Sequence, residues 1–380
     1  MKYNKEPLKL NSPVSFWMNF PNEERVFWVD CQSDRIVVGA KRLATVKDDN
    51  DRHNYAYVFY GDTFFDTVKD PKWSNMGHEM IAFTHYYIVE NGESFYLHAG
   101  ESVPIKNYEV PRVHHNYKET SDDKADWNRL MNAIADGISR GEMTKVVSSR
   151  EVEFTSETPY NVASILANLV DNNPNCFIFG YEKDGRTFVG ASPEILVRHR
   201  GSEILSYALA GTAPKDGPNA WTKEQLLTNK KNLVEHNIVR DRIVNTMKAI
   251  TPDVTVGETG IMELSHLYHL RTIITAKDST KSLVEWAKLL HPTPALGGEP
   301  REKALALLQE YESHERGMYA APFGFMKDMG DGIVVVAIRS ALIMDNVLYA
   351  YAGCGVVADS DADEEYAETN NKMRTILDAL

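Results

Sequence analysis

The segment from residue 85 to residue 98, H-Y-Y-I-V-E-N-G-E-S-F-Y-L-H, places a strong constraint on how this chain can fold. Two runs rich in β-branched and aromatic residues flank Asn91 and Gly92, a pair that tolerates the positive φ angles of a two-residue hairpin turn. Shorter β-rich runs lie at residues 26–29, 35–38 and 55–60, separated by polar turns. We therefore expect antiparallel sheet in the first 115 residues, where we find no catalytic motif.

Helical patterns follow in the rest of the chain. Residues 127–140 repeat apolar side chains at helical spacing, which predicts an amphipathic helix. Residues 223–250 form the longest helical pattern, and Pro252 stands just beyond its end. A shorter helix is predicted at residues 302–310, after a loop rich in proline and glycine.

The last acidic stretch, residues 359–372, predicts a helix whose aspartates supply N-cap groups and favourable charge at the positive helix end. Glu365, Glu368 and Lys372 would share one face of that helix because of their spacing. A solvated helix start with a surface pair between Glu368 and Lys372 is one explanation. A calcium-binding EF-hand loop does not fit, because Glu364 stands where such a loop requires glycine.

Four charged residues stand where the surrounding pattern is apolar. Lys145 begins a strand-like run, a place where lysine is usually solvated. Glu194 precedes a short apolar strand, and burial there would raise the pKa of its carboxyl. Glu235 shares a helix side with apolar residues, so a buried partner is expected. Arg339 is the single charge in I-V-V-V-A-I-R-S-A-L-I, for which a core salt bridge is the simplest explanation.

Several strand ends and loops carry polar groups. Gly211 and Thr212 end a buried-looking strand, where exposed backbone N–H groups can receive an anion. His269 lies at the end of another strand-like run, where a lone histidine is more often structural. His291 lies in H-P-T-P-A-L-G-G, and rigid loops of this composition shape pockets.

Composition narrows the classes of function. The chain has 41 Lys and Arg against 54 Asp and Glu, a net charge of −13, which argues against a nucleic-acid or anionic-membrane partner. Its three cysteines form no C-x-x-C pair, so we expect a cytoplasmic setting without a zinc site or disulfide framework. We find no apolar run of membrane-spanning length, no P-loop and no common hydrolase motif.

Nine short motifs follow one another from Lys145 onward: K-V-V-S-S-R, G-A-S-P-E, A-L-A-G-T-A, V-E-H, Y-H-L-R-T, H-P-T-P-A-L-G-G, E-R-G-M-Y-A-A-P, A-I-R-S-A and A-G-C-G-V-V-A-D-S-D. In this order they resemble the chorismate-utilising enzymes, most closely the isochorismate synthases of menaquinone and siderophore biosynthesis. The resemblance implies an α+β fold: a single large domain with two mostly antiparallel β-sheets packed face to face and flanked by helices. Residues 1–115 would be a variable, β-rich part of this fold, and residues 116–380 its chorismate-binding catalytic core.

The resemblance also implies roles for individual residues in converting chorismate to isochorismate. Lys145 would be the general base that activates water for attack at C2, and Glu194 the general acid that protonates the departing 4-hydroxyl. Glu235 and Glu368 would bind Mg²⁺, with Glu365 one helical turn before Glu368. The positions expected to contact the substrate are Gly211, Thr212, His269, Ala295, Tyr319, Arg339, Gly355 and Lys372.

Two positions bear on the choice within this family. Asn232 stands where relatives usually carry an acid, so either water or Asn232 would fill an outer-shell position of the metal. Ala295 stands where salicylate synthases usually have threonine. Anthranilate and aminodeoxychorismate synthases carry a less proline-rich loop and use ammonia from a glutaminase partner. We therefore expect an isochorismate synthase with no glutaminase subunit, as a monomer or weak homodimer.

A different class of function is a non-catalytic protein on the same fold that binds a metal or an anion. The presence of both Lys145 and Glu194 argues against it. Such a protein needs carboxylate clamps but has no use for an acid and base pair.

Overall fold

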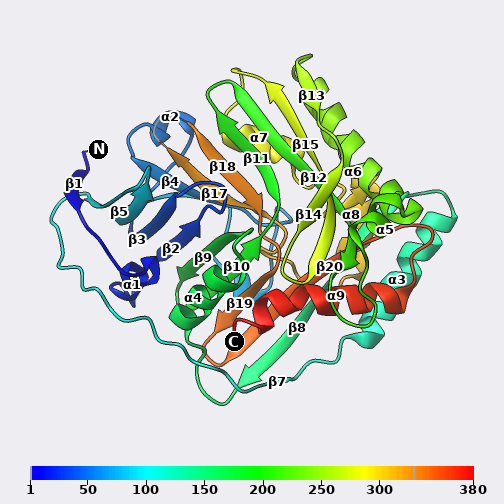
Figure 1. Ribbon diagram of the computed structural model, residues 1–380, viewed down its shortest axis with the longest axis horizontal. Helices are drawn as coiled ribbons and strands as arrows, with labels where there is room; N and C mark the ends of the chain where they lie inside the picture. The colour runs from blue at the N-terminus through cyan, green and yellow to red at the C-terminus, as the bar shows by residue number, and fades with distance from the viewer. Residues whose placement is uncertain (1, 328–329) are drawn as a thin grey trace.

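The computed structural model describes residues 2–327 and 330–380, and in these residues every strand pairing is antiparallel. The strands form one curled sheet with two halves (Figure 1). The first half contains, in spatial order, β7 (Tyr117–Glu119) and β16 (Gly298–Glu299) on one edge of β8 (Lys145–Ser156), then β20 (Val347–Val356), β19 (Ser340–Met344), β10 (Arg186–Ser192), β9 (Phe177–Lys183), β2 (Arg25–Val29), β3 (Ile36–Thr45), β5 (Glu79–Glu90), β6 (Glu93–His98) and β1 (Asn4–Pro7).

The second half continues from the start of β5. Its order is β4 (Tyr57–Gly61), β17 (Pro322–Lys327), β18 (Gly332–Val336), β11 (Ile195–Arg200), β12 (Glu203–Pro214) and β15 (Leu267–Lys277), with β13 (Val254–Val256) and β14 (Gly260–Glu263) both on the far edge of β15. Ile81 of β5 pairs with Thr45 of β3 on one edge and with Phe59 of β4 on the other. Strand β5 therefore belongs to both halves and joins them into one sheet.

The main core lies between the two halves. Trp28 on β2 stacks on Phe323 on β17 with ring centroids 6.3 Å apart, and Phe179 on β9 lies 4.7 Å from the same ring. These contacts join strands of opposite halves, so the halves pack face to face. The predicted α+β fold class is confirmed, with the added feature that β5 makes the two predicted sheets continuous.

Helices flank the sheet and are listed here in chain order: α1 (Pro13–Met18), α2 (Asp49–Arg52), the short 3₁₀ helix η1 (Pro71–Trp73), α3 (Lys124–Ser139), α4 (Val162–Asn172), α5 (Lys223–Thr228), α6 (Lys230–Lys248), α7 (Leu283–Leu290), α8 (Arg301–Tyr311) and α9 (Ala362–Leu377). Helix α6 packs along β12 and β15, and α9 along β20 (Figure 1). Within the described residues, none of these helices has the length and apolar character that crossing a bilayer requires.

The hairpin prediction is confirmed in detail. Strands β5 and β6 meet at Glu90 and Glu93, with Asn91 and Gly92 between them. Their φ angles are 54° and 77°, as a turn that follows the twist of the strands requires. The helices expected at residues 127–140 and 302–310 are present as α3 and α8.

The prediction of one long helix over residues 223–250 is wrong. Asn229 has ψ of 118°, ends α5 and begins α6, where its side chain accepts the backbone N–H of Asn232. This side-chain bond satisfies an N–H that a continuous helix would bond through its backbone, so a new helix starts here. The C-terminal helix is present, and the side chain of its N-cap Asp361 accepts N–H groups from Asp363 and Glu364.

Candidate active site

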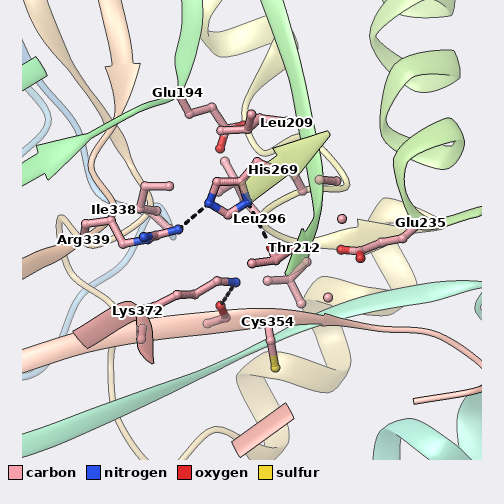
Figure 2. A pocket seen from close by; sticks show the side chains of 18 of the residues that line it. Glu194, Leu209, Thr212, Glu235, His269, Leu296, Ile338, Arg339, Cys354 and Lys372 are labelled. Carbon is pink, nitrogen blue, oxygen red and sulfur yellow. Dashed lines mark hydrogen bonds between the residues drawn. The ribbon is translucent and has the colours of Figure 1, made fainter. Parts of the chain in front are cut away.

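A cavity lies where the C-terminal strand β20, the helices α6 and α9, and strands β12 and β15 converge (Figure 2). Ten residues predicted from the sequence line it: Glu194, Gly211, Thr212, Glu235, His269, Ala295, Tyr319, Arg339, Gly355 and Lys372. Figure 2 shows Glu194, Arg339, Lys372 and Glu235 pointing toward this cavity from separate elements. The structure thus brings together residues that are up to 178 positions apart, from 194 to 372.

Glu194 lies in the short link between β10 and β11. Its backbone N–H donates to Ser192 Oγ at 3.2 Å, and its carbonyl oxygen accepts from the Val336 N–H at 3.0 Å, so the link is tied to β18. Burial raises the pKa of the Glu194 carboxyl to about 8, although the positive charges of Lys145, Lys372 and Arg339 act in the opposite direction. The expected desolvated carboxyl is confirmed, and at neutral pH it carries a proton.

Lys145 is the first residue of β8 and is fully buried. Its Nζ lies 3.0 Å from Glu235 Oε1 on α6, at ion-pair distance but off the direction of a hydrogen bond. Gly355 on β20 lies against both groups, since a Cβ there would approach Glu235 Oε1 to 2.1 Å and Lys145 Cε to 2.7 Å. The partner that Glu235 was expected to need is therefore Lys145, and glycine at position 355 makes room for the pair.

Arg339, His269 and Thr212 form a hydrogen-bonded row along the cavity. Arg339 donates to His269 Nε2 at 2.8 Å, and Nδ1 of the same ring lies 3.0 Å from Thr212 Oγ1. Burial, and then the charges of Arg339 and Lys372, hold the pKa of His269 well below its usual value. Because arginine only donates, Nε2 is the acceptor, so the neutral ring carries its proton on Nδ1 and donates it to Thr212.

The predicted core salt bridge of Arg339 is wrong. Arg339 lies in the link between β18 and β19, and no carboxylate in residues 2–327 and 330–380 lies at ion-pair distance from it. Burial lowers the pKa of this guanidinium, yet arginine stays charged in proteins. A buried cation without a carboxylate partner faces the cavity, which favours binding of an anion there.

Arg316 also lines the cavity, but its charge is already paired. It donates to both carboxylate oxygens of Glu312, at 2.9 and 2.5 Å, and to the carbonyl oxygens of Leu296 and Val147 at 2.8 and 2.7 Å. The two paired side chains are 1% and 2% exposed. Arg316 thus ties the loop that carries Ala295 to strand β8. We did not predict Arg316 from the sequence, although it lies in the motif E-R-G-M-Y-A-A-P.

Residues of the N-terminal region pack against this motif at Arg316 and Gly317. A Cβ at Gly317 would approach the Trp73 ring to 2.0 Å, and the Phe64 N–H donates to the Gly317 carbonyl oxygen at 2.8 Å. The Arg316 guanidinium lies 4.2 Å from the centroid of the Phe64 ring. A region without a catalytic motif of its own therefore holds one wall of the cavity in place.

Lys372 and Glu368 form the pair that their spacing predicts, at 2.6 Å. The pair is only partly exposed, at 13% for the Lys372 side chain and 26% for the Glu368 side chain, and Lys372 Nζ also donates to the Gly353 carbonyl oxygen at 2.7 Å. Glu365, one turn earlier, is buried. The explanation of residues 359–372 as a solvated helix start is therefore wrong for the helix face that carries Glu365, Glu368 and Lys372.

The three acids predicted as metal ligands each pair with a lysine: Glu235 with Lys145 at 3.0 Å, Glu365 with Lys231 at 2.8 Å and Glu368 with Lys372 at 2.6 Å. All three acids line a second cavity, which shares Thr212, Glu235 and Gly355 with the first. In the part of the chain that the structure describes, no three acidic, histidine or cysteine side chains are already grouped at metal-ligand spacing.

The chemistry of this acid group nevertheless fits a hard divalent cation. Burial raises the pKa of Glu365, and the negative charge of Glu368 raises it further, against the opposing effect of Lys231. A cation between these carboxylates would relieve that repulsion, and carboxylate oxygens are the donors that Mg²⁺ prefers. Glu235, Glu365 and Glu368 are therefore the residues that would hold Mg²⁺, in place of their present lysine partners.

Asn232 and His236 on α6 hold the strands beside the cavity. The Asn232 side-chain oxygen accepts the Thr212 N–H at 3.1 Å, so this residue fixes the backbone at Thr212. The His236 ring contacts the Ala210 carbonyl oxygen at 3.1 Å and Thr272 Oγ1 at 2.7 Å, and burial lowers its pKa to about 4. We did not predict His236, although it stands in the motif V-E-H.

Comparison with known proteins places this geometry in a family. The family model described as "chorismate binding enzyme" matches residues 97–380. The isochorismate synthase MenF of Bacillus subtilis is 36% identical over 264 residues, which are 68% of this chain and 56% of that protein. The isochorismate synthase DhbC of the same organism is 32% identical over 265 residues, which are 66% of this chain and 67% of that protein. The chain thus spans just over half the length of the first of these relatives.

A solved structure agrees over nearly the whole chain. The menaquinone-specific isochorismate synthase MenF from Escherichia coli superposes with a TM-score of 0.85, covering 99% of this chain and 94% of that one at 23% sequence identity. At this identity the likeness concerns the fold. The family match, which takes in every motif from Lys145 to Lys372, concerns the chain itself. This protein belongs to the chorismate-binding enzyme family.

Proposed function

We propose that this protein is an isochorismate synthase, which isomerises chorismate to isochorismate in the presence of Mg²⁺. The observation that carries the proposal is Glu194. A carboxyl whose pKa burial raises to about 8 is protonated at neutral pH and faces the same cavity as the guanidinium of Arg339, which pairs with no carboxylate among the described residues. A proton donor beside an anion-binding cation suits a substrate that carries carboxylates and must lose a hydroxyl group.

The names of the relatives support the same activity. Two proteins that are 36% and 32% identical to this chain are isochorismate synthases. The residues that line the two cavities supply the acid Glu194 and a group of carboxylates, and Lys145 lies beside them, against Glu235 and Gly355. An acid, a base and carboxylates for a cation are the set that this isomerisation needs.

In the proposed reaction, Lys145 takes a proton from a water molecule as the water oxygen bonds to C2 of chorismate. Both ring double bonds shift, C1=C2 to C1=C6 and C5=C6 to C4=C5, the C4–oxygen bond breaks, and Glu194 gives its proton to the departing hydroxyl, which leaves as water. One water molecule enters and one leaves, so the net change is an isomerisation. Because Lys145 is in an ion pair with Glu235, the lysine has to release a proton to solvent before its amine can take one from the attacking water.

The substrate carboxylates would be bound by Arg339, Lys372 and the backbone around Gly211, Thr212 and Gly355. His269 presents only its acceptor nitrogen to Arg339 and so aims the guanidinium without competing for the substrate. Tyr319 stacks on Tyr351 with centroids 5.4 Å apart, which fixes its ring at the cavity wall. Glu235, Glu365 and Glu368 would hold Mg²⁺, which when bound supplies positive charge that neutralises a substrate carboxylate.

We also propose that the protein works without a glutaminase subunit, as a monomer or weak homodimer, in the cytoplasm. The proline-rich loop around Ala295 supports the first point. The three cysteines, all free, fit a reducing compartment.

The test is incubation with chorismate followed by mass spectrometry of the products, with Mg²⁺ or with EDTA. Isochorismate formed only with Mg²⁺ is the expected result. Binding of chorismate without turnover would instead indicate a non-catalytic binding protein. An aminated product on addition of ammonium would assign the chain to the anthranilate synthase type of chemistry and overturn the proposal.

A further inference from the structure

Lys231 occupies an unusual place for a lysine. It lies in the first turn of α6, a turn that contains no acid and begins with a second lysine, Lys230. Positive charge is unfavourable at a helix N-terminus, because the N–H groups there already give that end a partial positive charge. Helix stability therefore does not account for a lysine at position 231.

The side chain of Lys231 reaches across to α9. Its Nζ lies 2.8 Å from Glu365 Oε1, and the two side chains are 28% and 4% exposed. The charges of Glu368 and Glu235 also act on this ammonium group, and all four side chains line the second cavity. Lys231 is thus one of three lysines that supply positive charge to these acids, and it is the one that pairs with Glu365.

The other two lysines of this group have separate contacts. Lys145 is fully buried beside Gly355, and Lys372 also donates to the Gly353 carbonyl oxygen. Among the described residues, Lys231 Nζ hydrogen-bonds to Glu365 alone. Its long, partly exposed side chain can swing toward solvent without breaking any other bond.

We propose that the Lys231 ammonium competes with the divalent cation for Glu365 and thereby keeps cation binding weak and rapidly reversible. This inference rests on the proposed function, because it takes the three acids as the cation ligands. A divalent cation at the acids must displace the ammonium from the Glu365 oxygen and also approach a like charge. Removing the ammonium removes both obstacles, so affinity for the cation should rise.

The test is isothermal titration of the full chain with Mn²⁺ and with Mg²⁺, in the absence of chorismate. Lys231→Met keeps the side-chain length and removes the charge, and we expect its Kd for both cations to fall about tenfold or more, a change of about 1.4 kcal/mol. Lys231→Arg keeps the charge and should bind within about threefold of the wild type. Lys230→Met is the matched control: it removes an exposed lysine from the same helical turn and should leave the Kd unchanged.

An alternative role for Lys231 is a brace between α6 and α9. In that case Lys231→Met lowers the melting temperature in EDTA, and its Kd for the cation is unchanged or higher than that of the wild type. Either of these two results for the Kd overturns the inference. If Lys231→Met does not fold, Lys231→Gln replaces it, with the same outcomes. If the wild type binds neither Mn²⁺ nor Mg²⁺, both the metal assignment and this inference are overturned. If the wild type binds a cation but Lys231→Met does not bind it more tightly, only this inference is overturned.

Discussion

The guanidinium of Arg339 donates a hydrogen bond to Nε2 of His269 at 2.8 Å, while no carboxylate in the described residues pairs with it. The neighbouring Arg316 is held by both oxygens of Glu312. Two buried arginines therefore line one cavity in different electrostatic states. The charge of Arg316 is neutralised by Glu312, whereas the charge of Arg339 can bind an anionic ligand.

Arg339→Met is therefore expected to weaken chorismate binding. Each hydrogen bond to a charged group contributes about 1.5–3 kcal/mol, so KM should rise about 10- to 100-fold. Steady-state kinetics and titration calorimetry with chorismate measure the effect. Arg200→Met, at the exposed end of β11, is the control and should leave KM unchanged. An unchanged KM in Arg339→Met would show that the anion binds elsewhere.

Glu194 is expected to set the alkaline limit of activity. As a general acid it works protonated, and its pKa of about 8 means that the contribution of Glu194 to kcat/KM should be level below that pH and fall about tenfold per pH unit above it. Glu194→Gln should lose activity by about 10²- to 10⁴-fold and lose this alkaline limb. The pH–rate profiles of the wild type, Glu194→Gln and the exposed-site control Glu203→Gln check both points. An alkaline limb that persists in Glu194→Gln belongs to another group.

Lys145→Ala is expected to abolish turnover and to leave binding of chorismate largely intact. The lysine acts on water, and removal of a general base lowers kcat by about 10²- to 10⁴-fold. Single-turnover kinetics and calorimetry separate the two effects. Turnover within about tenfold of the wild type would remove Lys145 from the mechanism. Lys118→Ala, on the exposed strand β7, is the control.

Gly355→Ala is expected to disturb the pair of Lys145 and Glu235. The added Cβ would lie 2.1 Å from Glu235 Oε1 and 2.7 Å from Lys145 Cε, so both side chains must move. Misplacement of a catalytic group by about 1 Å can cost about 100-fold in rate, and we expect a loss of this order with little change in melting temperature. Gly260→Ala, whose Cβ would meet no atom within 4 Å, is the control. Full activity in Gly355→Ala would mean that catalysis does not depend on the observed positions of Lys145 and Glu235.

Ala295→Thr is expected to change the product. Ala295 lines the cavity, and threonine adds a β-branch and a hydroxyl that would hold the enolpyruvyl group over the ring, where it can take the C2 hydrogen. A difference of about 1.4 kcal/mol between two barriers changes their rate ratio about tenfold. The wild type should release isochorismate with little pyruvate, and the variant should form more pyruvate and salicylate.

A coupled lactate dehydrogenase assay and salicylate fluorescence measure both fractions. Ala306→Thr, at an exposed position of α8, is the control. Stoichiometric pyruvate from the wild type would assign it to the salicylate-forming branch of the family.

Local sequence determined the elements whose stability depends on nearby residues. Asn91 and Gly92 specified the β5–β6 turn because few other pairs accept positive φ at both positions. The cap at Asp361 placed the start of α9 for a similar reason. Asn229 carried a local signal too, and our prediction of one long helix overlooked that an asparagine inside a helical pattern can cap a new helix.

The order of the motifs determined the family and the residues that meet in the cavity, but not how those residues pair. Lys145 and Glu235 are 90 positions apart, and Arg339 and His269 are 70 apart, so their contacts depend on how the sheet curls. A buried charge needs a compensating group, but sequence does not say whether that group is a carboxylate, as for Arg316, or a histidine nitrogen, as for Arg339. Only the packing of β18, β15 and α8 around one cavity decided this, because long-range electrostatic pairing depends on distances that no local pattern encodes.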